Sequence, residues 1–269
     1  MSDQNNPTSK FLSAPREVIK TPVDFGTTAI PEYSSLYACI LDNVLSASEC
    51  LTLLNLAKAS TDGEWAHAMI NSGPGGSQQL DTESRACGRI IWEDESIVRG
   101  IWARCRGSVP ELMELRHRPE ITGKGWLKRD WGYRLKGLDK KMRFLRYFDG
   151  EYFRRMLIHH CSESQKILLT ASPAHFDATH TGSQDEEASF ITMHLYLNEP
   201  DEDSMLEGGA TRFHAMDGSK RNLDVEPKTG RVLLFQHEGL LHSGANVTRG
   251  VKYSMRTDLM YVECDRIQE

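Results

Sequence analysis

The chain has 269 residues, of which 39% are hydrophobic and 26% are charged, and its formal net charge is −6 at pH 7. This length allows one large domain or two small ones with a sizeable apolar core. Because no run of Lys or Arg dominates, the composition argues against nucleic acid or an acidic membrane as the main partner. No stretch approaches the roughly 20 apolar residues that a membrane-spanning helix needs.

The cysteines and the first residues bear on the cellular compartment. Six cysteines are scattered without C-x-x-C spacing, and the chain opens on the polar segment MSDQNNPTSK rather than on an apolar signal segment. Reduced thiols are typical of the cytosol. We therefore expect a cytoplasmic protein, with the nucleus as the alternative.

The N-terminal half combines a polar segment with helical patterns. Residues 1–34 are rich in Pro, Ser and Thr, which predicts a mobile N-terminal arm, with an extended arm as the alternative. We expect residues 35–264 to form a single domain. Within it, residues 35–140 are expected to provide helical support and residues 141–264 to form a β core.

One strand and two helices are predicted in the support region. The segment LYACILDNVL indicates a strand, and EDESIVRGIWARCRGSVPELMEL has helical periodicity. Between them, SASECLTLLNLAKAS predicts a helix, because Ser46 stands three residues before Glu49 as in a capping box. The apolar face of this helix is expected to consist of Leu51, Leu54 and Leu56.

The pattern changes after Met142 to short alternating segments separated by Gly, Pro and Asp. This spacing indicates an all-β sandwich or barrel. Gly208 and Gly209 are expected to serve a tight backbone turn at a corner of the barrel. The segments are MRFLRYF, SFITMHLYLN, GGATRFH, GRVLLFQH and VKYSMRTDLMY.

Histidine and aspartate in the motif HFD predict part of a metal site. His175 and Asp177 are two positions apart, so on a strand their side chains point to the same face and can meet one metal ion. A second histidine would complete a 2-His-1-carboxylate triad, which leaves coordination positions open. His242, after the strand GRVLLFQH, fits that role. Lys252, ten residues further on, could hold a dicarboxylate by its far end.

As an ordered set, these motifs resemble the Fe(II)/2-oxoglutarate-dependent dioxygenases of the prolyl 4-hydroxylase-like family, specifically its alpha-subunit catalytic domain. The resemblance covers roughly residues 38–261. It is sharpest in FLRYFDGEYF, FITMHLYLNEP, LEGGATRF and VEPKTGRVLLFQHEGLLHSGANVTRGVKYSMRTDLMY. It implies a mainly β fold with flanking helices, the double-stranded β-helix, a jelly roll of the cupin-like kind.

The resemblance also implies roles for individual residues. His175, Asp177 and His242 would bind Fe(II), and Lys252 would pair with the C5 carboxylate of the co-substrate 2-oxoglutarate. Tyr147, in RYFDG, matches a tyrosine that lines the same pocket. Ascorbate would be expected to keep the iron reduced.

Strand alternation in FITMHLYL places further side chains. Thr192, His194 and Tyr196 share the face that would look into the barrel, and Tyr196 is a candidate hydrogen-bond donor to 2-oxoglutarate. The opposite face should pack on helices or on the other sheet and consists of Ile191, Met193, Leu195 and Leu197.

Arg256 shares a strand face with Lys252 and is a rival for the co-substrate carboxylate. Four residues along a strand span about 13 Å, so both cations cannot hold the same carboxylate end-on. The spacing implied by the resemblance favours Lys252.

The activity implied is hydroxylation of a C–H bond in a peptidyl residue or a small molecule, with O2 consumed and succinate and CO2 released. The alternative is a catalytically impaired binding or regulatory protein on the same fold. A nucleic-acid demethylase of the same chemistry is disfavoured because no basic groove is evident. The fold by itself does not identify the substrate.

The segment before His175 is longer than the resemblance allows. RYFDGEYFR ends at Arg154, whereas in the family the tyrosine-glycine motif leads within a few residues to P-H-x-D. We interpret residues 155–174 as a translated intron, because its excision would leave a proline directly before His175. A surface insertion or substrate lid is the alternative.

Three histidines near the motif are interpreted as bystanders. His159 and His160 fall inside the segment that we interpret as an intron. His180 follows the metal motif and stands close enough to support a ligand.

Overall fold

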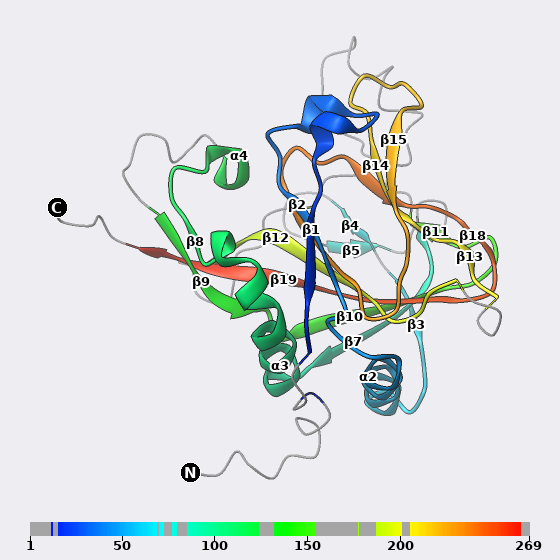
Figure 1. Cartoon of the computed structure of the whole chain (residues 1–269). Coiled ribbons are helices and arrows are strands. Elements are labelled where there is room, and N and C mark those ends of the chain that lie inside the picture. Colours follow the sequence, from blue (N-terminus) through cyan, green and yellow to red (C-terminus); the bar gives the residue numbers. More distant parts are fainter. Residues whose placement is uncertain are drawn as a thin grey trace, which may run out of the picture.

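Two antiparallel β-sheets face each other in the computed structural model of this chain (Figure 1). The Tyr196 hydroxyl of the larger sheet donates to Thr211 Oγ1 of the smaller sheet at 2.6 Å, and the rings of Phe235 and Phe213 meet edge to face at 5.6 Å. The structure describes residues 12, 16–68, 70–72, 77–79, 85–123, 132–153, 177, 187–200 and 205–264. The predicted fold, mainly β with flanking helices in a double-stranded β-helix, is confirmed.

The larger sheet carries the long central strands of the molecule. Within the described residues it has ten strands, ordered β1-β2-β16-β12-β19-β10-β7-β3, with β9 pairing β19 and β8 pairing β9. The strands are β1 (Ile19–Pro22), β2 (Ala38–Asp42), β3 (Ala66–His67), β7 (Gly88–Glu93), β8 (Glu114–Leu115), β9 (Gly132–Leu138), β10 (Lys141–Tyr147), β12 (Glu187–Tyr196), β16 (Val232–Gln236) and β19 (Lys252–Cys264).

The smaller sheet and two short ribbons complete the β structure of the described residues. The smaller sheet has the order β15-β14-β17-β11-β6. Its strands are β6 (Arg85–Ala86), β11 (Tyr152–Phe153), β14 (Thr211–His214), β15 (Asn222–Val225) and β17 (His242–Gly244). The ribbons pair β4 (Ile70–Ser72) with β5 (Ser77–Gln79) and β13 (Glu207–Gly208) with β18 (Val247–Arg249).

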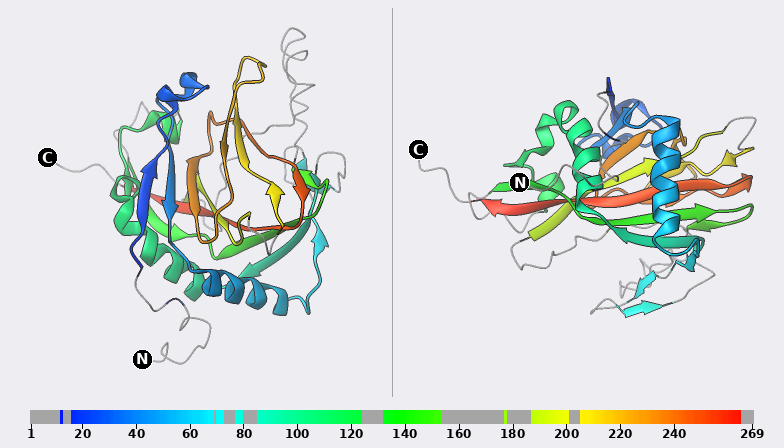
Figure 2. Two further views of the ribbon diagram at one scale, coloured as in Figure 1. Left: turned by 45° about the vertical axis from the view of Figure 1, so that its right-hand side comes forward. Right: turned by 90° about the horizontal axis from the view of Figure 1, so that it is seen from below.

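Helices α2 (Ala47–Ala59) and α3 (Glu95–Cys105) cover the outer face of the larger sheet, on the side away from the smaller sheet (Figure 2, left). The described residues also form the short helix α4 (Pro119–Thr122) and the 3-10 turns η1 (Phe25–Thr27), η2 (Pro31–Tyr33), η3 (Arg106–Ser108) and η4 (Pro110–Leu112). The outward residues of β12, Ile191, Met193 and Leu195, pack into the same core cluster as the helices, as predicted.

Helix α2 begins as the sequence predicts, and its buried face includes Leu54 but not Leu51. The capping box is present: Ser46 Oγ accepts from the Glu49 amide at 3.2 Å, and the Glu49 carboxylate accepts from the Ser46 amide at 2.7 Å. Leu51, however, is 58% exposed. The buried stripe contains Cys50, Leu53, Leu54 and Ala57, a spacing of three, four and seven positions that matches one side of a helix.

The prediction of a mobile arm over residues 1–34 is wrong for its C-terminal part. β1 extends the larger sheet by pairing Ile19–Pro22 with Cys39–Asp42 of β2. Phe25, Ile30 and Tyr33 are almost fully buried between the sheets. The polar composition of residues 1–34 gave no indication that these three apolar side chains are buried. Their burial stabilises an ordered segment. Residues 1–11 and 13–15 lie outside the described residues.

The predicted boundary between helical support and β core at residue 140 does not separate two structures. β2, β7 and β9 precede it, yet they join the same sheet as β10, β12 and β19. β7 pairs directly with β10 from Lys141 to Arg146. Non-local pairing of this kind has no local sequence signal, which is why the boundary was misplaced.

Some predicted features lie outside the described residues. These are the segment 155–174, His175 and His180. Among the residues that are described, no helix is long and apolar enough to cross a membrane.

Candidate functional site

The inner face of the larger sheet brings the candidate residues into one row. The register pairs Tyr147 of β10 with Lys252 of β19, and His194 of β12 with Arg256 of β19. Thr192 and Tyr196, two positions to either side of His194, share its face, because side chains alternate along a strand. We call this row of inward-facing side chains from β10, β12 and β19 the floor of the site.

Asp177 and His242 meet over this floor. Nε2 of His242 lies 3.6 Å from Oδ2 of Asp177, and both side chains are buried. His242 comes from β17 of the smaller sheet, so the two residues are brought together only when the sheets face each other. Two of the three predicted metal ligands thus lie side by side. His175, the third, lies outside the described residues.

The imidazole of His242 is held in one orientation. Its Nδ1 is 3.0 Å from the Leu240 carbonyl, which can only accept, so Nδ1 carries the hydrogen and Nε2 keeps its lone pair towards Asp177. The rings of Phe235 and Phe213 pack on it at 4.8 and 6.2 Å. Burial lowers the pKa of His242, which favours the neutral form that binds metals.

Two side chains orient the Asp177 carboxylate. Thr192 Oγ1 donates to Oδ2 at 2.7 Å, and Arg256 Nη1 donates to Oδ1 at 2.7 Å. Hydrogen bonds to a ligand carboxylate fix its direction and influence metal affinity. A buried carboxylate beside a neutral imidazole is the donor set that a divalent metal of the Fe(II) type accepts. The residues present therefore fit the implied iron, with His175 as the predicted third ligand.

Lys252 places a buried cation at the other end of the floor. Its side chain is 3% exposed, its Nζ donates to the Gly209 carbonyl at 2.5 Å, and the rings of Tyr147 and Tyr196 lie 5.4 and 5.5 Å away. No carboxylate of the described residues forms an ion pair with it. Burial lowers the pKa of Lys252 to about 8. Within the described ranges, the buried ammonium has no negative charge beside it to offset its own, and an anionic ligand would supply one.

The glycine pair before Lys252 makes room for it. Gly208 and Gly209 both have φ of +77°, a backbone conformation that favours glycine. A Cβ on Gly209 would lie 2.9 Å from Cδ of Lys252, and one on Gly208 would lie 2.4 Å from the Asn246 carbonyl oxygen. The predicted tight turn stays a prediction, and the two glycines leave space for the lysine side chain.

The structure gives Tyr196 and Arg256 different partners from those predicted. The Tyr196 hydroxyl already donates to Thr211 Oγ1, so its ring rather than its hydroxyl hydrogen faces Lys252. Arg256, the rival cation, is paired with Asp177 and lies 3.5 Å from Asp258. This leaves Lys252 as the unpaired cation of the floor among the described residues.

Three polar atoms on the floor have no hydrogen-bond partner within the described part of the chain. They are His194 Nε2, Ser254 Oγ and Arg256 Nε, all inaccessible to solvent. Ser254 pairs in register with Tyr196 and stands between Lys252 and Arg256 on β19. Orphaned buried polar atoms are uncommon in native structures. They fit a floor that is completed by a polar co-substrate lying between the metal ligands and Lys252.

A buried charge cluster next to the site was not predicted. Asp258 accepts from Arg143 at 3.3 Å and lies 3.7 Å from Nε2 of His237. Burial opposes ionisation of Asp258, but Arg256, His237 and Arg143 outweigh it and hold its pKa well below the usual range. The only available sequence signal was strand alternation, which places Asp258 on the face of Lys252 and Arg256.

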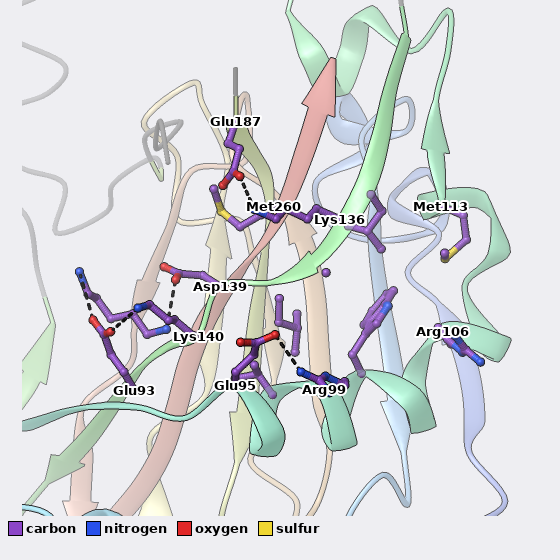
Figure 3. Close-up of a pocket in the computed structure, with 16 residues that line it drawn as sticks. Glu93, Glu95, Arg99, Arg106, Met113, Lys136, Asp139, Lys140, Glu187 and Met260 are labelled. Carbon is purple, nitrogen blue, oxygen red and sulfur yellow. Dashed lines mark hydrogen bonds and ion pairs between the residues drawn. The ribbon is translucent and has the colours of Figure 1, made fainter. Parts of the chain in front are cut away.

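A separate cavity of about 630 Å³ lies on the side of α3 and β9 (Figure 3). Its rim is made of ion pairs, among them Arg99 with Glu95 at 2.8 Å and Lys140 with Glu93 at 3.1 Å. Among the described candidates, none of Asp177, His242 and Lys252 lines it. Exposed ion pairs of this kind contribute little energy and are typical of a solvated surface.

Comparisons with known proteins bear on this site. Residues 169–257 match the family model described as the 2OG-Fe(II) oxygenase superfamily. The matched region contains all three predicted metal ligands, together with Tyr196 and Lys252. A comparison with curated proteins gives no sequence match.

Solved structures with a similar fold include three prolyl hydroxylases. The viral collagen prolyl hydroxylase of Paramecium Bursaria Chlorella virus-1 is 18% identical, with a TM-score of 0.47 over 84% of this chain and 96% of that chain. The Pseudomonas putida prolyl-4-hydroxylase is 18% identical, with a TM-score of 0.48 over 88% and 95%. A Trichoplax adhaerens prolyl hydroxylase, solved with a hypoxia inducible factor peptide fragment, is 15% identical, with a TM-score of 0.48 over 87% and 88%.

Proposed function

We propose that the protein is an Fe(II)- and 2-oxoglutarate-dependent dioxygenase, and the match of residues 169–257 to the model of the 2OG-Fe(II) oxygenase superfamily supports this. It would hydroxylate a C–H bond of a peptidyl residue or a small molecule. Ascorbate is proposed as the reductant that keeps the iron in its ferrous form.

One observation carries the proposal: a two-ligand metal end and an unpaired buried cation occupy opposite ends of one strand-built floor. Asp177 and His242 form the metal end, and Lys252 forms the other. Thr192 contacts Asp177, and the Tyr196 ring lies beside Lys252, four residues further along β12. Four residues of strand span about 13 Å. A dicarboxylate bound to the metal at one end can reach towards the lysine from there.

Bound iron together with 2-oxoglutarate and O2 would supply the oxidation of a C–H bond, releasing succinate and CO2. The chain's own residues bind the metal and the co-substrate, orient them and shield them from solvent. Asp177 and His242 provide an anionic oxygen and a neutral nitrogen, each aimed by a hydrogen bond. Lys252 fixes the far carboxylate and so sets the direction in which the co-substrate enters.

The metal end and the lysine end are both buried, which strengthens the interactions made there. Phe213 and Phe235 shield His242 from solvent, and Tyr196 is fully buried under the lysine. Excluding water raises the strength of charge–charge and charge–dipole interactions in such a site.

Anaerobic titration of the purified protein with Fe(II) and 2-oxoglutarate tests the proposal. We expect a visible iron-to-2-oxoglutarate charge-transfer band in the wild-type chain. The band should be lost in His175→Ala and His242→Ala, and it should remain in His67→Ala, a control that changes an exposed histidine. A wild-type chain without the band contradicts the proposal.

The second candidate, an impaired protein on the same fold, is favoured by the position of residues 155–174 directly before His175. A displacement of about 1 Å in a ligand can be costly to catalysis. The same titration on a chain in which one proline replaces residues 155–174 separates the two candidates. A band in the shortened chain alone would identify the segment as the cause and support its interpretation as a translated intron. Sequencing the transcript tests that interpretation directly.

A further inference from the structure

The side chain of His194 lies midway along the floor of the proposed co-substrate site. On β12 it stands between Thr192, which contacts Asp177, and Tyr196, whose ring lies beside Lys252. Its imidazole stacks on the Tyr196 ring at 4.8 Å with an interplanar angle of 26°. Across the sheet it pairs in register with Arg256. It thus has the metal end on one side and the lysine end on the other.

A chain of hydrogen bonds favours one tautomer of this imidazole. The Tyr196 hydroxyl donates to Thr211 Oγ1 at 2.6 Å, which leaves the Thr211 hydrogen for another acceptor. Nδ1 of His194 lies 3.3 Å from the same oxygen. The arrangement in which Nδ1 accepts uses this Thr211 hydrogen, and in it a neutral imidazole carries its own hydrogen on Nε2. Burial, with Lys252 and Arg256 nearby, lowers the pKa of His194 well below its usual value, in agreement with the neutral form.

The Nε2–H group has no acceptor among the described residues, although the atom is inaccessible to solvent. A buried donor without an acceptor costs about 1–3 kcal/mol. The groups with the strongest electrostatic influence on the imidazole are the cations of Lys252 and Arg256, which cannot accept a hydrogen bond. What this position lacks is an acceptor that also offsets positive charge, and a carboxylate meets both needs.

We propose that His194 is a further co-substrate-binding residue, whose Nε2–H donates a hydrogen bond to the 2-oxoglutarate carboxylate held by Lys252. This inference rests on the proposed function. The stacking on Tyr196 fixes the plane of the imidazole, and Thr211 favours this tautomer, so the donor is positioned before the ligand arrives. Lys252 would attract the carboxylate by its charge, and the hydrogen bond from His194 would fix the orientation of the carboxylate.

Two substitutions separate the hydrogen bond from simple packing. His194→Leu keeps an apolar side chain on the floor but removes the donor, whereas His194→Gln keeps an N–H group at similar reach. Affinity for 2-oxoglutarate is measured anaerobically on the Fe(II)-loaded protein, from the charge-transfer band and from titration calorimetry. Fe(II) affinity and the circular dichroism spectrum are recorded for each variant, to verify the metal end and the fold.

We expect His194→Leu to raise the dissociation constant for 2-oxoglutarate by about 10- to 100-fold, the effect of a hydrogen bond to a charged group. His194→Gln should stay within about threefold of the wild type, and Fe(II) affinity should be unchanged in both. Equal affinity in the wild type and His194→Leu overturns the inference. So does a loss in His194→Gln as large as that in His194→Leu.

Failure of the proposed function looks different from failure of this inference. A wild-type protein that binds no 2-oxoglutarate refutes both, whereas normal wild-type binding with an unaffected His194→Leu refutes only the role of His194. If His194→Leu does not fold, His194→Asn replaces it. Its shorter amide can reach Thr211 but not the pocket, so it should bind 2-oxoglutarate as weakly as expected for His194→Leu. Wild-type affinity in His194→Asn would overturn the inference.

Discussion

Arg256 Nη1 donates to Asp177 Oδ1 at 2.7 Å, so the cation that rivals Lys252 for the co-substrate is paired with a predicted metal ligand instead. The same guanidinium lies 3.4 Å from Thr192 Oγ1 and 3.5 Å from Asp258. Arg256 thus ties the carboxylate of Asp177 to a buried charge cluster. Its place in the site is to position a ligand, and Lys252 remains available for an anion.

Removing the Arg256 guanidinium should weaken metal binding. In Arg256→Met the Asp177 carboxylate loses a charged donor, and we expect Fe(II) affinity to fall by about 10- to 100-fold, as for other residues that orient a ligand. Arg143→Met is the matched control, because Arg143 also pairs with Asp258 but no ion pair joins it to Asp177. Anaerobic Fe(II) titration measures both. Equal losses in the two variants would assign the effect to Asp258 rather than to Asp177.

Thr192 should influence the same ligand through one hydrogen bond. Thr192→Val keeps the shape but leaves Asp177 Oδ2 without its 2.7 Å donor, and we expect about tenfold weaker Fe(II) binding. Thr192→Ser retains the hydroxyl and should restore affinity to near the wild-type value. A valine variant that binds Fe(II) as tightly as the serine variant would show that this contact does not orient the ligand.

Binding of 2-oxoglutarate should depend on pH through Lys252. Its pKa, lowered by burial to about 8, means that the ammonium is charged below that pH and neutral above it. Affinity should therefore be full below the pKa and fall by about tenfold per pH unit above it. Lys252→Arg, whose guanidinium stays charged, should lose this dependence. An equally steep decline in the arginine variant would assign the titration to another group.

The same lowered pKa has an opposite consequence for stability. Between about pH 8 and the ordinary lysine pKa, the folded state binds fewer protons at Lys252 than the unfolded state does. Lys252 therefore lowers the free energy of unfolding by its full amount at pH values below its pKa in the folded state. This destabilisation decreases as pH rises from about 8 to the ordinary lysine pKa. Urea unfolding of the wild type and Lys252→Met across the window measures it. A difference between them that does not change with pH contradicts the assignment.

Gly209 should be required for the lysine end of the site. In Gly209→Ala the new Cβ would stand 2.9 Å from Lys252 Cδ and would displace the side chain. We expect at least about tenfold weaker 2-oxoglutarate binding, equivalent to the loss of one charge-assisted hydrogen bond. Gly63→Ala is the control for backbone strain, because Gly63 has a similar φ of +85° and a methyl group added there would meet no atom within 4 Å. Both should lose stability, but only Gly209→Ala should lose affinity.

Part of the site could be predicted because it follows from local rules. Alternation along β12 correctly separated the outward Ile191 and Met193 from the inward Thr192 and Tyr196. The pair Ser46 and Glu49 marked the start of α2, because a capping box is complete within four consecutive residues. The family resemblance implied that His242 would meet Asp177, and the structure places the two 3.6 Å apart.

Other parts could not be predicted, because they depend on which strands pair. Phe25 and Tyr33 look like isolated apolar residues in a polar segment, yet β1 and β2 carry them into the core. The Tyr196 hydroxyl was expected to serve the co-substrate, but Thr211 on the opposite sheet accepts its hydrogen. Neither contact has a local signature.

The amino-acid order alone specifies the kinds of group that this protein can bring to a site. The pattern of His175, Asp177, His242 and Lys252 is a property of composition and spacing, and alternation decides which side chains share a face. Which of those groups remain free to bind is settled by contacts between the sheets. Arg256 forms an ion pair with Asp177, whereas Lys252 and Nε2 of His194 lack an anionic partner among the described residues. The physical reason is that pairing and desolvation depend on register and burial, which are set between strands far apart in the chain.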